Sequence, residues 1–295
     1  MKALHLVGPR KFHLVEVEKP HMAPNEVLIK VAYAGICGSD LHTFHGQNAR
    51  IKYPAILGHE MSGEIVETGS QGLAFKVGDR VTINPFVACQ TCHTCQSGNQ
   101  HLCGNRYFYG MTKAGGFAEY MKVKAQHLHK IEDAVPLDVA AMTEPYAVGV
   151  HAVNRSGLHI GDKVVILGGG PIGLMTALAA RKAGAGLVAI SEISDYRLHQ
   201  ITELGFMAID AKQVDLKQKV MELTDGIGAD VVFDAAGASS TSRQMTQILK
   251  TKGTAIIVGL YSGTPQVDLN DVNFRELSIK GTVVYTERDF KYTVQ

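Results

Sequence analysis

The order of hydrophobic and polar positions changes near Gly149. Before it, short apolar or alternating runs are separated by glycine, proline and asparagine, a pattern typical of β-strands joined by tight turns. These runs cover residues 2–7, 26–32, 63–67 and 78–83. So many short strands predict a β-rich domain, barrel-like or sandwich-like, that extends to about residue 150.

After residue 161, strand-like runs alternate with segments of helical length. The strand-like runs are 163–167, 186–192, 230–234 and 253–259, and the helical ones are 173–182, 197–204 and 242–249. This alternation is typical of βαβ units, which build a parallel sheet. The sequence therefore predicts an α/β protein with domains over residues 1–150 and 151–285, followed by a short segment, 286–295.

Composition places the chain among ordinary globular proteins. It has 295 residues, of which 45% are hydrophobic and 19% charged, and its net charge is +1. So small a charge provides no bulk attraction to nucleic acid or to an anionic membrane. The N-terminus becomes polar within a few residues, and the apolar runs are only as long as strands, so we expect neither a signal peptide nor a membrane span. A cytoplasmic location is expected.

Four of the five cysteines lie within fifteen residues, at Cys89, Cys92, Cys95 and Cys103. The short gaps let neighbouring sulfurs converge, and four thiolates saturate a tetrahedral zinc ion, which makes such a site closed and structural. An iron–sulfur cluster or unused cysteines are the alternatives, although no second cysteine cluster accompanies the run. His93 and His101 lie in the same loop and offer further ligands.

A glycine-rich segment follows the strand-like run 163–167 and opens an apolar helix. Gly168, Gly170 and Gly173 form the pattern G-x-G-x-x-G. In a βαβ unit the first glycine permits a tight turn, the second lets pyrophosphate approach the backbone, and the third lets helix and strand pack closely. The free N–H groups at the start of the helix face the phosphates. We therefore predict a dinucleotide site.

Glu192 ends the next strand-like run, nineteen residues after Gly173. A carboxylate there accepts hydrogen bonds from the ribose hydroxyls and repels a 2′-phosphate, which favours NAD over NADP. Arg197 is close enough in sequence to lie near the same ribose. A solvated charge at a strand end is the alternative role for Glu192.

A second set of potential metal donors lies near the N-terminus. Residues 35–42 contain Cys37, Ser39, Asp40 and His42, and the tripeptide Gly58-His59-Glu60 follows. If these two loops meet, Cys37, His59 and a carboxylate hold one Zn²⁺ with an open coordination position. A lone thiol is more often a small buried apolar group, so this inference depends on the combination of motifs.

With these motifs in this order, the chain resembles the zinc-dependent medium-chain dehydrogenase/reductase family. The resemblance covers the whole chain. It implies a GroES-like catalytic domain followed by a Rossmann domain, with the active site in the cleft between them. The segments that carry it are residues 35–42, 58–60 with Gly63 and Gly69, 78–81, the four-cysteine loop, 143–145 and 168–173.

The resemblance also implies roles for individual residues. Cys37 and His59 would bind the catalytic zinc, with Glu60 as a third or exchangeable ligand. Glu144 stands where the alcohol dehydrogenases of the family have a second cysteine ligand, and this replacement resembles the polyol branch, such as sorbitol and 2,3-butanediol dehydrogenases. Asp40 would orient His59 through its other ring nitrogen.

The implied reaction transfers hydride from a secondary alcohol or polyol to NAD and produces a ketone. Zinc lowers the pKa of the substrate hydroxyl, and Ser39, the cofactor ribose and His42 would pass the proton to solvent. Two zinc ions per chain are implied, one catalytic and one structural. L-threonine dehydrogenase and simple alcohol dehydrogenase are the alternatives within this class.

Members of the family usually continue for several dozen residues beyond the strand expected at 277–284. The helix expected at 289–295 would begin a segment that returns to the catalytic domain, so we expect most of that segment to be missing and apolar surface to be uncovered. A catalytically silent zinc- and nucleotide-binding protein is therefore a further alternative. Homodimers or homotetramers through the Rossmann domain are common in the family.

Overall fold

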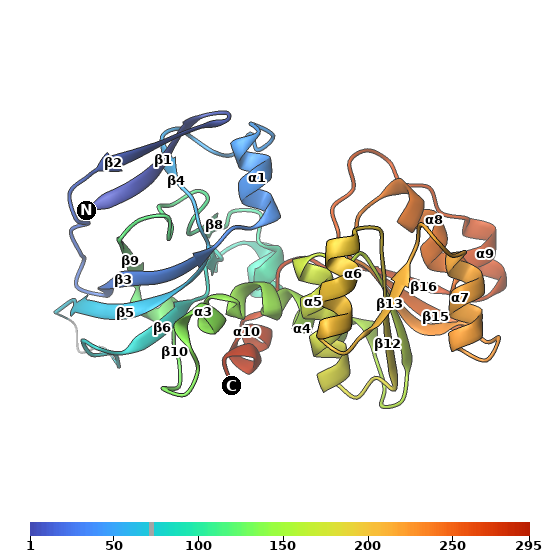
Figure 1. Cartoon of the computed structure of the whole chain (residues 1–295). Coiled ribbons are helices and arrows are strands. Elements are labelled where there is room, and N and C mark those ends of the chain that lie inside the picture. The colour runs from blue at the N-terminus through green and yellow to red at the C-terminus, as the bar shows by residue number, and fades with distance from the viewer. Residues whose placement is uncertain (71–73) are drawn as a thin grey trace. The chain divides into compact units, whose positions relative to one another are not determined.

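The computed structural model describes residues 1–70 and 74–295. The chain forms two compact units (Figure 1). Unit 1 comprises Met1–Glu144 together with Thr286–Gln295, and unit 2 comprises Pro145–Tyr285.

Unit 1 is built on antiparallel sheets. Its largest sheet contains, in spatial order, β10 (Leu128–Lys130), β6 (Arg80–Ile83), β5 (Glu60–Thr68), β3 (Glu26–Gly35) and β9 (Tyr120–Lys124). A second sheet contains β2 (Lys11–Glu16), β1 (Lys2–Gly8) and β4 (Ala55–Ile56), and a third pairs β7 (Phe86–Val87) with β8 (Tyr107–Phe108). Val27, Ile29, Met61 and Ile65 from β3 and β5 belong to its buried core. The predicted β-rich unit is therefore present.

Short helices connect these strands. They are α1 (Gly38–Phe44), α2 (His93–Gln96), α3 (Leu137–Ala141), η1 (Gln100–Leu102) and η2 (Ala125–His127), and α4 (Thr143–Ser156) leads from unit 1 into unit 2. The chain returns to unit 1 through α10 (Glu287–Val294), which lies against β10. Phe290 is fully buried there, with its ring 4.8 Å from that of His129. α10 begins before the predicted residue 289 because Thr286 and Asp289 form a capping box.

Unit 2 is a doubly wound parallel sheet, as predicted. Its strands lie in the order β13 (Met207–Asp210), β12 (Leu187–Glu192), β11 (Lys163–Leu167), β14 (Ala229–Asp234), β15 (Leu249–Ile257) and β16 (Ser278–Gly281). Val164 and Ile166 face a core formed with α4, α5 (Pro171–Lys182) and α6 (Asp195–Glu203). Val165 and Leu167 face the opposite core with α7 (Leu216–Leu223) and α8 (Ser239–Gln247), beside α9 (Leu269–Phe274). Figure 1 shows helices on both faces of this sheet.

Two boundaries in unit 2 differ from the prediction. The helix expected at 242–249 ends at Gln247, and Leu249 already belongs to β15, where it pairs with Ala229 across a bulge. Leu249 is buried in the core of unit 2. Pairing and burial in the sheet outweigh the helical pattern of the preceding residues. β16 is also shorter than the strand expected at 277–284.

The burial of Phe290 predicts how firmly α10 is attached. Replacing Phe290 with alanine should weaken the attachment of α10 by about 3 kcal/mol or more, because a fully buried ring would leave a cavity. Hydrogen exchange of the α10 amides should become correspondingly faster. Tyr292→Ala is the matched control, since that ring is 53% exposed and its loss should change stability by only about 0.5 kcal/mol. Equal effects of the two variants would contradict the prediction.

Candidate active site

The pairing of β3 with β5 assembles the first group of potential metal donors. In this antiparallel register Gly35 lies opposite Glu60. Cys37 follows β3 as the N-cap of α1, and His59 immediately precedes β5. One ligand atom each from Cys37, His59 and Glu60 lies within 4.8 Å of the other two. The two loops that the sequence sets apart thus meet in the structure.

Gly35 is required for the position of the Glu60 carboxylate. A Cβ atom at Gly35 would lie 2.3 Å from Glu60 Oε2 and 3.1 Å from Glu60 Cβ. The first separation is shorter than real Cβ contacts, and the second is tighter than most of them, so a side chain at position 35 would displace the Glu60 carboxylate. Glycine at position 35 thus lets the Glu60 carboxylate take the position that it has beside Cys37 and His59.

Asp40 and Phe108 surround His59. Asp40 Oδ2 accepts a hydrogen bond of 2.9 Å from the Cys37 N–H. Asp40 Oδ1 lies 3.7 Å from His59 Nδ1, and both of these buried atoms lack a hydrogen-bond partner among the described residues. Asp40 thus approaches the ring as expected but at more than hydrogen-bond distance. The Phe108 ring meets the His59 ring edge-on at 5.5 Å, a contact that sequence reasoning did not assign.

Burial favours the neutral forms of these groups. It raises the pKa of the Cys37 thiol to about 12, against the opposing effect of Ser39, and it raises the pKa of Glu60. Burial also lowers the pKa of His59 to about 4, so the imidazole is neutral, as a metal ligand must be. A divalent cation would compensate the thiolate and carboxylate charges. One sulfur, one nitrogen and one oxygen donor are a ligand set that suits zinc, so the residues fit the metal.

Glu144 lies close to this cluster but not in it. It is buried in the first turn of α4, and its charge contributes to the raised pKa of the Cys37 thiol. The three-donor cluster contains Glu60 instead. Ser39 and His42 both lie on α1; Ser39 is half-buried, whereas His42 is exposed and places Nδ1 2.7 Å from Gln47 Oε1.

The four-cysteine loop forms a separate cluster. Cys92 and Cys95 place their sulfurs 3.5 Å apart, and the Cys89–Cys95 and Cys92–Cys103 sulfur distances are both 3.9 Å. Four thiolates around a tetrahedral zinc stand about 3.8 Å apart, given a Zn–S bond of about 2.3 Å. A disulfide would require about 2.05 Å. The loop therefore has the dimensions of a zinc–thiolate site, and neither His93 nor His101 belongs to the cluster.

The backbone of this loop supports thiolate character. The Cys89 N–H donates to Cys103 Sγ at 3.4 Å. The N–H groups of Thr91 and Cys92 lower the pKa of the Cys89 thiol to about 6. Burial and the neighbouring sulfurs raise the pKa of the Cys95 thiol to about 12. Because thiolates rather than thiols bind metal, a cation is needed to hold all four sulfurs in that form.

The glycine loop in unit 2 joins β11 to α5. Gly168 adopts a φ of +98°, which suits glycine. A Cβ at Gly173 would lie 1.9 Å from the Gly168 carbonyl oxygen, so the helix and the turn pack as closely as the motif requires. Gly170 is the N-cap of α5, and a Cβ there would meet only the guanidinium of Arg197, at 3.7 Å. The start of α5 is therefore open to a ligand.

Glu192 is buried beside the glycine loop rather than solvated. Its Oε2 accepts from the Gly169 N–H at 2.9 Å, and its Oε1 accepts from the N–H groups of Ile193 and Ser194 at 2.7 and 3.0 Å. Burial opposes the charged form, but these bonds and Arg197, at 3.4 Å, hold the pKa of Glu192 below its ordinary value. A stable negative charge thus stands next to the turn.

Comparison with known proteins agrees with both units. Residues 23–133 match the alcohol dehydrogenase GroES-like domain, and residues 171–295 match the zinc-binding dehydrogenases. Sorbitol dehydrogenase of Halalkalibacterium halodurans is 41% identical over 96% of this chain and 84% of its own length. The 2-dehydro-3-deoxy-L-galactonate 5-dehydrogenase of Pseudoalteromonas atlantica is 38% identical over 100% of this chain and 86% of its own length. Among solved structures, 2R,3R-butanediol dehydrogenase from Bacillus subtilis has a TM-score of 0.93 and 33% identity, and the match covers 99% of this chain and 86% of that one.

The chain belongs to the zinc-binding dehydrogenases with a GroES-like domain, the zinc-dependent medium-chain dehydrogenase/reductase family. The resemblance inferred from the sequence and the predicted fold are thereby confirmed. This chain is a zinc-dependent oxidoreductase that uses a nicotinamide cofactor. Within residues 1–70 and 74–295, no helix is both long and apolar enough to span a membrane.

The two clusters predict the metal content. We expect about two zinc ions per chain, one for each ligand set. Cys37→Ser should retain about one zinc with little change in melting temperature, whereas Cys95→Ser should lose the other zinc and lower the melting temperature, because metal acts as the core of that loop. Elemental analysis measures the zinc content of each variant, and thermal unfolding measures its melting temperature. A Cys37→Ser variant that kept two zinc ions would contradict the ligand assignment.

Proposed function

We propose that this enzyme oxidises a secondary alcohol or polyol to a ketone with NAD as the hydride acceptor. The observation that carries the proposal is the convergence of Cys37, His59 and Glu60 on one point in unit 1. Three protein donors would leave a coordination position open for substrate if they held zinc. The four-cysteine loop offers four donors and would leave none, so the two sites differ in kind.

Cys37, His59 and Glu60 would hold the catalytic zinc. Zinc supplies Lewis-acid chemistry, which polarises the substrate oxygen and lowers the pKa of its hydroxyl. Asp40 keeps the Cys37 backbone in place through its hydrogen bond and stands behind His59. Phe108 packs edge-on against the His59 ring.

We assign the path of the substrate proton to Ser39 and His42. These residues are three positions apart on α1 and therefore lie on neighbouring turns of one helix face. Ser39 is half-buried next to Cys37, and His42 is exposed. The Ser39 hydroxyl would accept the proton from the substrate hydroxyl, and His42 would release a proton to solvent at the surface.

The Glu144 carboxylate favours a polyol over a simple alcohol as the substrate. Together with Glu60 it places two carboxylates near Cys37, and both raise the pKa of that thiol. A carboxylate at position 144 makes the surroundings of the metal donors more hydrophilic than a second thiolate would. The sorbitol, butanediol and sugar-acid dehydrogenases among its relatives agree with this substrate class.

The glycine loop and Glu192 support NAD. Gly168, Gly170 and Gly173 would seat the pyrophosphate at the start of α5. The buried carboxylate of Glu192 would accept from the adenosine ribose and repel a 2′-phosphate. Arg197 lies beside the same carboxylate, so it would contact the ribose rather than replace Glu192.

Three further predictions from the sequence stay proposals. Residues 1–150 and 151–285 would act as the catalytic and nucleotide-binding domains. The chain would form a homodimer or homotetramer through the second of these. Its location would be cytoplasmic.

A substrate panel tests the proposed reaction. The zinc-loaded enzyme should form NADH with diols or sugar alcohols faster than with ethanol or L-threonine, and Cys37→Ser should reduce that rate by a factor of about 10³ or more, because the Lewis acid is lost. The rise of NADH absorbance measures it. Faster turnover of L-threonine than of every polyol would refute the substrate class, and an active Cys37→Ser variant would refute the site.

Cofactor choice should depend on the charge of Glu192. Glu192→Gln keeps the side-chain size and an acceptor oxygen but removes the negative charge. We expect the NADP/NAD ratio of kcat/KM to rise about tenfold, a change of about 1.4 kcal/mol. Glu203→Gln, an exposed position on α6, is the control and should leave the ratio unchanged. An unaltered ratio in Glu192→Gln would remove the basis for the NAD preference.

A further inference from the structure

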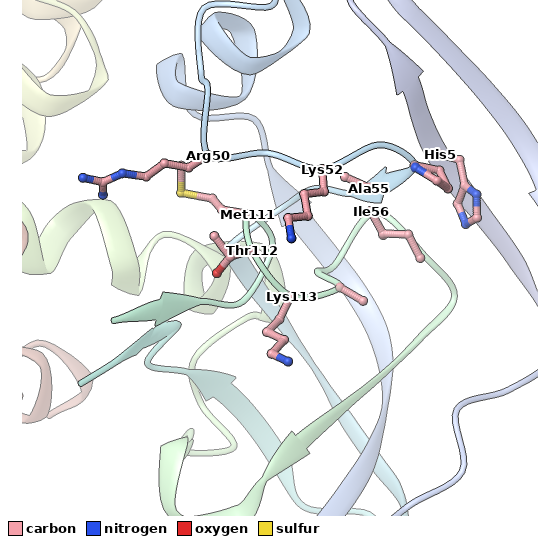
Figure 2. Close-up of a pocket in the computed structure, with 10 residues that line it drawn as sticks. His5, Arg50, Lys52, Ala55, Ile56, Met111, Thr112 and Lys113 are labelled. Atoms are coloured by element: carbon pink, nitrogen blue, oxygen red, sulfur yellow. The ribbon is translucent and has the colours of Figure 1, made fainter. Parts of the chain in front are cut away.

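Unit 1 has a hollow of about 460 Å³, and every charged residue that lines it is basic. Its charged lining residues are Arg50, Lys52 and Lys113, with His5 beside them, and no acidic residue lines it. Figure 2 shows Lys52 and Lys113 extending in the same direction from two different segments, with Arg50 reaching to one side and His5 at the other. The volume lies in the range of small-molecule sites.

These cations lack protein counter-charges. Within the described parts of the chain, Arg50, Lys52 and Lys113 form no ion pair, whereas Lys122 and Lys130 of the same unit pair with carboxylates. The Lys113 ammonium lies 5.8 Å from the centroid of the Tyr107 ring. All three side chains are exposed, and without neighbouring carboxylates their charges give the hollow a positive local field, which attracts anions from solution.

The wall that carries Lys113 is held in a closed turn. The Lys113 N–H donates to the Phe108 carbonyl at 3.1 Å, and the Gly110 N–H donates to the Lys113 carbonyl at 2.9 Å. The Phe108 N–H also donates to Thr112 Oγ1 at 2.9 Å. Because the turn is closed by three bonds, the base of the Lys113 side chain is fixed, which lowers the cost of ordering it around a ligand.

The basic hollow shares its walls with the metal cluster. The turn that presents Lys113 also presents Phe108, whose ring contacts His59. The lining also includes Ala55 and Ile56 of β4, and the chain continues from there through Gly58 to His59. The Gly115 N–H donates to the Ile56 carbonyl at 3.0 Å and joins this segment to the one that carries Lys113. A ligand in the hollow would thus touch the same segments that position the metal donors.

We propose that this basic hollow binds the oxyanion of a small molecule, a carboxylate or a phosphate, through Lys52 and Lys113, with Arg50 and His5 at its edges. Two ammonium groups suit an oxyanion because each donates charge-assisted hydrogen bonds to it. The proposal concerns binding alone and does not depend on which alcohol the enzyme oxidises.

Calorimetric titration tests the proposal on zinc-loaded enzyme saturated with NADH, which occupies the pyrophosphate site. Inorganic phosphate and gluconate are titrated separately, and at least one should bind saturably. Lys52→Gln and Lys113→Gln should each weaken that binding about tenfold, through loss of one charge-assisted hydrogen bond. Lys11→Gln, an exposed position on β2 outside the hollow, is the matched control and should bind as the parent does.

The outcomes separate the sources of the oxyanion. Binding of phosphate alone identifies a phosphate ester as the ligand class, and binding of gluconate alone identifies a sugar acid. No saturable binding of either anion would overturn the proposal. Equal affinity in the parent, Lys52→Gln and Lys113→Gln proteins, with unchanged melting temperatures, would also overturn it, because the anion would then bind elsewhere.

Discussion

The antiparallel pairing of β3 with β5 is the interaction on which the active site depends. Its register sets Gly35 opposite Glu60, so the end of β3 and the start of β5 lie side by side. A shift by one residue would turn the side chains of β5 to the opposite face and separate Cys37 from Glu60. The buried residues of β3 and β5 hold this register, and hydrophobic packing therefore fixes the geometry of a polar site.

In both metal clusters, the protein alone does not compensate the negative charges that the donor side chains carry as metal ligands. Burial disfavours the thiolate of Cys37 and the carboxylate of Glu60, and the four sulfurs of the other loop already stand at the spacing of zinc ligands. In both clusters a bound cation would stabilise the negatively charged donors through its own positive charge. Glu192 shows the opposite solution, since three backbone N–H groups stabilise its charge without any ligand.

Much of the site could be predicted because its signals are local. The spacing of Cys89 to Cys103 is short enough for the backbone itself to bring the sulfurs together, and the G-x-G-x-x-G pattern requires glycine for steric reasons within one turn. Phe108 could not be assigned in this way. An aromatic residue in a β-rich unit usually belongs to the core, and nothing in the sequence indicates that its ring contacts His59, forty-nine positions earlier.

The sequence by itself determined the family, the alternation of strands and helices in unit 2 and the identities of the potential metal donors, since these follow from residue type and short spacing. Only the tertiary structure decided that Glu60 rather than Glu144 joins Cys37 and His59 within one cluster, that Glu192 is buried, and that Lys52 and Lys113 line one hollow. The reason is physical: these relations depend on strand register and on the packing of segments distant in the chain, which no local pattern encodes.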